Sequence, residues 1–236
     1  MKKPFYLLLT LAMTATTFYG FSLTYFGPTI SNPFAGTLSP TVHVHGWSFF
    51  LWYLLVPLQA GLVAARRIKV HQTLGIASIA LASLMMLTGV VVLTVQVAAG
   101  SPFWATFGLL ILSNLVLFAV FYVLALRNRR RPEIHKRYMV LASSVGVGAA
   151  MFRIMLRFPA VPMPVLVGVL LTNLFIIAAM VHDHRTEKRV HPVYIRGLAV
   201  AVVTESLMVP LAMSGAGGMI NDVLGSVGRV LGVLYF

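Results

Sequence analysis

Seven long apolar runs, separated by short basic or turn-forming blocks, constrain the fold of this chain more than any other feature. The runs cover about residues 5–26, 42–65, 73–99, 103–126, 138–158, 163–182 and 193–213. Each is about as long as a helix needs to be to cross a hydrocarbon core of roughly 30 Å at about 1.5 Å per residue. Because lipid offers the backbone no hydrogen bonds, the runs are predicted to be helices.

The composition supports this assignment. Of the 236 residues, 59% are hydrophobic and only 10% are charged, and the mean hydropathy is +0.91. A soluble core cannot bury so much apolar surface. The sequence therefore predicts an all-α membrane protein with one transmembrane bundle over residues 1–213.

Each end of the chain leaves an alternative open. The run at 5–26 could be a cleaved signal peptide, but it is longer than the usual apolar region of about 7–15 residues, so we expect a first membrane helix. Residues 214–236 have apolar residues at helical spacing, interrupted by Asp222 and Arg229. They are predicted to form an amphipathic interfacial helix. An eighth span is the alternative, and it would move the C-terminus to the other side.

The positive charge is distributed unevenly. The net charge is +13, and of the 18 lysines and arginines only Arg153, Arg157 and Arg229 lie away from the ends expected to share one side. Since basic loops stay in the cytoplasm, the N-terminus is predicted inside and the C-terminus outside a bacterial inner membrane. The basic blocks lie between apolar runs, so they are expected to meet anionic lipid headgroups and not nucleic acid.

A short internal repeat suggests how the helices pair. Spans two and three, four and five, and six and seven each surround a basic loop that is followed by a histidine: His71, His135 and His191. Spans four and six also share Ser113-Asn-Leu115 and Thr172-Asn-Leu174. We therefore expect three helical hairpins and a peripheral N-terminal helix.

The repeated histidines are the first candidate site. The chain has no cysteine, so a metal would need His, Asp, Glu or Met ligands. His71, His135 and His191 could converge from the three hairpins on a transition metal or a haem, with Asp183 or His184 nearby. The alternative is that these histidines only reach headgroups, because none has a His-x-x-x-His partner.

Other polar residues lie deeper in the apolar runs. Arg153 needs an anionic partner or water at membrane depth, and His45 is expected near it across the bundle. Glu205, if buried alone, would hold a proton and suit proton transfer; pairing with Arg153 is the alternative. Gln59 and the similarly buried Gln96, Asn114 and Asn173 are expected to make interhelical hydrogen bonds.

Several motifs together resemble a group of uncharacterised bacterial polytopic inner-membrane proteins with repeated Arg-x-x-x-His helix starts. They are His45-Gly-Trp47 to Gln59, Arg67-x-x-x-His71-x-x-x-Gly75, Arg131-Pro-x-x-His135-Lys-Arg-x-Met139, Arg153, Asp183-x-Arg185 and Val190-His191-Pro192. The resemblance covers residues 19–197 and implies no activity. It marks these positions for testing: His45, Gln59, His71, His135, Arg153, Asp183 and His191. The helix-opening histidines are also similar to those of membrane proteins that bind haem or assist oxidase assembly.

Two functions remain open from the sequence. The first is metal- or haem-dependent redox or hydrolytic chemistry on a membrane-embedded substrate. The second is a non-enzymatic transporter or an assembly factor for a membrane complex, with a partner subunit or a second copy of the chain. The sequence contains no Gly-x-Ser-x-Gly, phosphate-binding glycine loop or His-Glu-x-x-His.

Overall fold

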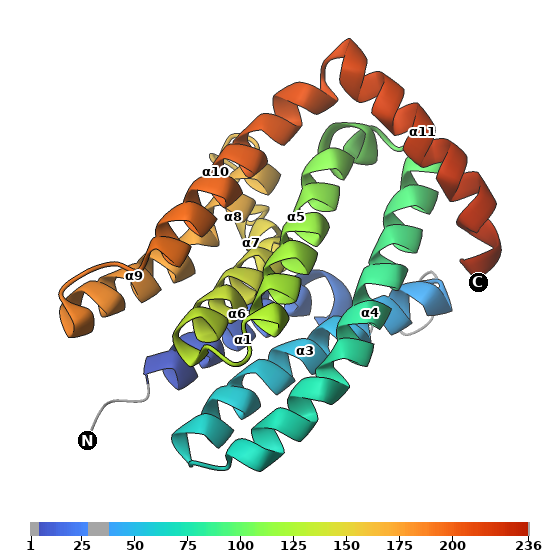
Figure 1. The fold of residues 1–236 in the computed structure, drawn as a ribbon. Coiled ribbons are helices and arrows are strands. Elements are labelled where there is room, and N and C mark those ends of the chain that lie inside the picture. Colours follow the sequence, from blue (N-terminus) through green and yellow to red (C-terminus); the bar gives the residue numbers. More distant parts are fainter. Residues whose placement is uncertain (1–4, 28–37, 236) are drawn as a thin grey trace.

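The computed structural model describes residues 5–27 and 38–235 as a bundle of helices (Figure 1). In chain order these are α1 (Phe5–Phe21) with a π-helical turn (Ser22–Phe26), α3 (Pro40–Ala64), α4 (Ile68–Ala98), α5 (Pro102–Arg127), α6 (Pro132–Gly146), α7 (Gly148–Met155), α8 (Pro164–Leu171), α9 (Asn173–Glu187), α10 (Pro192–Ala212), α11 (Gly215–Leu231) and a short 3₁₀ turn (Gly232–Leu234).

Seven helical segments in this described part are long and apolar enough to cross a bilayer. They are Phe5–Phe26, Pro40–Ala64, Ile68–Ala98, Pro102–Arg127, Pro132–Met155, Pro164–Glu187 and Pro192–Ala212. The chain is therefore an all-α integral membrane protein, as the apolar runs predicted. Lys2 and Lys3, which contributed to the predicted orientation, lie outside the described residues.

Local sequence explains where the helices begin. Proline occupies the first turn of α3, α5, α6, α8 and α10, where its missing N–H is not needed. Arg67 and Arg131 are the N-caps of α4 and α6, so both helices start inside the basic blocks and extend past the predicted spans. His71 and His135 consequently lie within helices.

The helices pack partly as the repeat predicted. α3 packs against α4, and α5 against α6, as neighbouring antiparallel pairs (Figure 1). The third pair is more open, because α10 packs against α5 and α6 as well as α9. α7 packs against α8 on the far side of the bundle in this view.

The N-terminal helix is anchored to the bundle by close contacts. α1 packs against α3 and α7, and Met13 is fully buried. Thr14 Oγ1 donates a hydrogen bond to the Tyr53 carbonyl at 2.5 Å. A Cβ at Gly20 would lie only 2.4 Å from the Ala150 carbonyl oxygen, so glycine is required for this approach.

The C-terminal segment forms a separate helix, α11, after a break at Ser214. It crosses outside the ends of α4 and α5 (Figure 1) and packs along α4. Thr41 Oγ1 donates to the Leu234 carbonyl at 2.8 Å, and Gln96 Nε2 donates to the Tyr235 hydroxyl at 3.0 Å. α11 is not among the helices that qualify as spans, and an interfacial position for it stays a prediction.

Two of the membrane helices change locally to i→i+3 hydrogen bonding, while their backbone angles stay helical. α6 gives way to α7 at Val147, whose N–H donates to the Ser144 carbonyl, three residues back, at 3.0 Å. The Ser143 carbonyl, four residues before Val147, therefore does not accept from the Val147 N–H. It accepts a hydrogen bond from the Tyr53 hydroxyl at 2.7 Å. α8 gives way to α9 at Thr172, whose N–H donates to Val169 at 3.1 Å.

Candidate functional site

A buried arginine organises one end of the bundle, which we call the basic end because the turns around Arg66, Arg130 and Lys188 lie there. Arg137 of α6 is fully buried. Its guanidinium pairs with Asp183 and Glu187 of α9, each at 2.8 Å, and with Glu133 at 2.9 Å. Three of the five acidic residues in the chain therefore surround one cation.

His191 belongs to this ion-pair cluster. Its backbone N–H donates to Asp183 Oδ2 at 3.4 Å, and its Nδ1 accepts from the Val193 N–H at 3.2 Å, which caps α10. Burial lowers the pKa of the His191 imidazole, and the positive charge of Arg137 acts in the same direction. Both effects favour the neutral ring that the cap needs. His184 is exposed on α9.

The other two repeated histidines meet elsewhere at the basic end. The rings of His71 and His135 have their centres 6.3 Å apart and their planes at 82°. His135 Nδ1 lies 2.9 Å from the Ala125 carbonyl oxygen, to which it donates. His71 Nδ1 is buried and has no hydrogen-bond partner in the described part of the chain.

The expected three-histidine centre is not formed. Within residues 5–27 and 38–235 no three His, Asp or Glu side chains are grouped to hold a metal ion. His71 and His135 each follow their N-cap arginine by four residues, whereas His191 is itself an N-cap. His135 and Arg137 are two residues apart, about 200° around α6, so they face different neighbours.

Gln59 of α3 lies beside His71. Its backbone carbonyl interacts with the His71 ring. Its side-chain Nε2 is 3.7 Å from the position that a Cβ of Gly75 would take, and Gly75 is one turn after His71 on α4. Its Oε1 is buried and makes no hydrogen bond to the described residues.

His45 and Arg153 lie towards the opposite end. His45 Nδ1 is 3.2 Å from Thr88 Oγ1, and its ring is within electrostatic range of Arg153. The Arg153 guanidinium covers the Phe21 ring at 4.2 Å and donates to Thr24 Oγ1 at 2.9 Å. The two side chains make their hydrogen bonds to different residues, Thr88 and Thr24, so the expected pairing of His45 with Arg153 stays a prediction.

Glu205 of α10 is the one carboxyl group buried in the middle of the bundle. It is fully buried, and its Oε2 accepts from Asn173 Nδ2 at 2.7 Å. Glu205 Oε1 and Asn173 Oδ1 are buried and have no partner among the described residues. Glu205 pairs with Asn173 and not with Arg153, which was the sequence-based alternative.

Asn114 of α5 lies beside the boundary between α6 and α7. Its Oδ1 is buried, has no partner within the described ranges, and is 3.6 Å from the Cβ position of Gly148, which also faces Val169. Val169 is one turn before Asn173. We call Glu205, Asn173 and Asn114 the Glu205 cluster: Glu205 and Asn173 are joined by a hydrogen bond next to the break at Thr172, and Asn114 lies beside Gly148 at the break after Val147.

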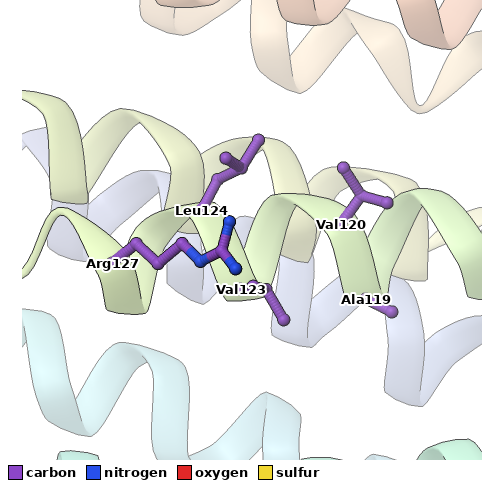
Figure 2. Close-up of a pocket in the computed structure, with 5 residues that line it drawn as sticks. All are labelled: Ala119, Val120, Val123, Leu124 and Arg127. Atoms are coloured by element: carbon purple, nitrogen blue, oxygen red, sulfur yellow. The ribbon is translucent and has the colours of Figure 1, made fainter.

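A shallow apolar groove runs along the outer face of α5. It is lined by Ala119, Val120, Val123, Leu124 and Arg127, and Figure 2 shows the Arg127 side chain running back along the helix towards Leu124. Val120 and Val123 are 47% and 45% exposed, so the groove opens outward and does not reach the Glu205 cluster.

Arg137 is the functional or structural residue that sequence reasoning missed, because it was counted with the topology-determining charges. Glu133, one turn earlier on the same helix, and the pair Asp183 and Glu187, one turn apart on α9, were the available signal. Comparison with protein-family models, with curated proteins and with solved structures gives no match for this chain.

Proposed function

We propose that the protein is a non-enzymatic membrane carrier that binds and releases a proton at Glu205. The observation that carries this proposal is the burial of Glu205 in the bundle with an amide as its hydrogen-bond partner and with Oε1 unpartnered in the described part of the chain. An ionisable residue at membrane depth commonly marks a path for ions or protons.

The distribution of acidic residues singles out this carboxyl group. Glu133, Asp183 and Glu187 pair with Arg137, and Asp222 is exposed on α11. Among the described residues, Glu205 forms no ion pair with a basic side chain. Burying an unpaired carboxylate costs several kcal/mol, so a proton is expected to neutralise it.

The surrounding helices support a binding role. Local tightening of a helix to i→i+3 hydrogen bonds often marks a functional position. Here the breaks at Val147 and Thr172 lie beside the Glu205 cluster. The unpartnered oxygens of Asn114 and Asn173 could bind water that connects Glu205 to either side.

Infrared spectroscopy of the protein in liposomes tests the proposal. The wild type is expected to show the carbonyl band of a protonated carboxylic acid at neutral pH, and Glu205→Gln should remove it. Asp222→Asn is the matched control and should leave the band unchanged, since Asp222 is exposed. In the same liposomes, Glu205→Gln should abolish uptake of any solute that an imposed pH gradient drives.

Two results would contradict the proposal. In the first, the wild-type protein lacks the carboxylic-acid band at neutral pH and its thermal stability rises with Na⁺. This result would indicate that Glu205 binds a metal cation. The other is a band that persists in Glu205→Gln.

The orientation in the membrane and the surface contacts are proposed from the predicted topology. We propose that the basic end faces the cytoplasm of a bacterial inner membrane, because positively charged loops are retained there. Arg127 beside the apolar groove of α5 suits an anionic headgroup above an acyl chain. The same exposed face could instead contact a partner subunit or a second copy, as an assembly factor would. A three-histidine metal or haem enzyme has no support from the arrangement of His71, His135 and His191.

A further inference from the structure

His71 and His135 offer two nitrogen donors whose positions are set by the first turns of two helices. Each histidine lies four residues after an N-cap arginine. The backbone N–H of the histidine donates to the carbonyl of that arginine, at 3.1 Å for His71 and 2.9 Å for His135. The two hairpins thus present their rings from equivalent first turns. The ring centres are 6.3 Å apart.

The remaining hydrogen bonds leave one nitrogen of each ring available. His135 Nδ1–H donates to the Ala125 carbonyl, which fixes the tautomer and leaves the Nε2 lone pair free. His71 Nδ1 is buried and unpartnered within the described residues, and the Gln59 backbone carbonyl lies near the ring. A buried nitrogen without a partner requires an explanation, and a bound ion is one.

The ring separation restricts the ion. With a metal–nitrogen distance of about 2 Å, two imidazoles on one ion place their centres about 5 Å apart at a tetrahedral angle and about 6.5 Å apart in a line. The observed 6.3 Å is longer than the tetrahedral spacing and close to the spacing of two rings in a line. Linear coordination by two donors is characteristic of Cu(I), whereas zinc takes four ligands.

The local charge also favours a monovalent ion. Both histidines lie in the first turn of a helix, where the helix dipole is positive, and each follows an N-cap arginine. This positive potential opposes a divalent ion more than a monovalent one. We propose that His71 and His135 together bind one Cu(I) ion at the basic end, independently of proton binding at Glu205.

Competition with a Cu(I)-specific chromophoric chelator, under anaerobic conditions and in detergent, tests the proposal. The wild type should retain one Cu(I) per chain, and His71→Ala or His135→Ala should weaken binding by more than about 100-fold, beyond the loss typical of residues that only support a ligand. His135→Met, which supplies a thioether donor suited to Cu(I), should restore binding to within about tenfold of the wild type.

The control is His184→Ala, which removes an exposed histidine at the same end and should leave Cu(I) affinity unchanged. Thermal midpoints of all variants show whether each is folded, and X-ray absorption of the wild type should show two nitrogen neighbours. A wild type that releases Cu(I) as readily as His71→Ala would overturn the proposal. An equal loss of Cu(I) affinity in His184→Ala would also overturn it. The same holds if the wild type binds Zn(II) more tightly than Cu(I), or if it shows a haem absorption band that His135→Ala removes.

Discussion

Arg137 shows how a single residue can decide the arrangement of several helices. Its guanidinium connects α6 to α9 through Asp183, whose side chain is 1% exposed, while Glu187 and Glu133 are 36% and 62% exposed. The Tyr194 ring of α10 lies 5.8 Å from the guanidinium carbon. If Arg137 were lost, the Asp183 carboxylate would therefore remain buried without a counter-ion.

Arg137→Met is expected to destabilise the protein by about 3–5 kcal/mol, because it leaves the Asp183 carboxylate buried without a counter-ion. Adding Asp183→Leu should recover most of this loss, since the two remaining carboxylates reach solvent. The measurement is unfolding in mixed detergent, with Arg185→Met as the exposed control at the same end. Equal stability of Arg137→Met and wild type would show that the cluster is not structural.

Among the elements, α11 depends on close backbone contact. A Cβ at Gly228 would lie 2.0 Å from the Thr94 carbonyl oxygen of α4, whereas a Cβ at Gly218, on the same helix, would meet nothing within 4 Å. The amphipathic pattern of residues 214–236 predicted the helix. It did not show that glycines would bring the helix against α4.

Gly228→Ala and Gly218→Ala are therefore expected to act in opposite directions. Gly228→Ala should destabilise the protein by about 1–3 kcal/mol, because the added methyl group collides with backbone. Gly218→Ala should stabilise it by about 0.5–1 kcal/mol through helix propensity. The thermal unfolding midpoint of each variant is measured from the protease sensitivity of the C-terminal segment. A change of the midpoint in the same direction in both variants would contradict the packing of α11 on α4.

At the scale of the whole molecule, all three basic turns lie at one end, and the turn around Ala160 lies at the other. The predicted orientation follows from this asymmetry, because positively charged loops are retained in the cytoplasm. The absence of cysteine makes the orientation easy to test, since any introduced thiol is the sole target for labelling.

In intact cells, a membrane-impermeant maleimide is expected to label Ala160→Cys and Met219→Cys, both at exposed positions. Thr186→Cys, exposed at the basic end, should react only after the cells are made permeable. The cysteine-free wild type is the control. Labelling of Thr186→Cys in intact cells would reverse the topology, and protection of Met219→Cys alone would show that the C-terminal helix is not on the outside.

The sequence determined the class, the seven spans and their approximate limits, because hydropathy, proline positions and basic blocks act through local properties that need no long-range contact. It also identified Glu205, His45 and Arg153 as unusual, since polar groups are rare in such runs. Only the tertiary structure decided which of these residues meet. Their partners depend on helix rotation, and a shift of one or two residues in where a helix begins turns a side chain towards a different neighbour. That is why the His71 and His135 rings lie close together, while His191, placed one turn earlier in its helix, donates its backbone N–H to Asp183 beside Arg137.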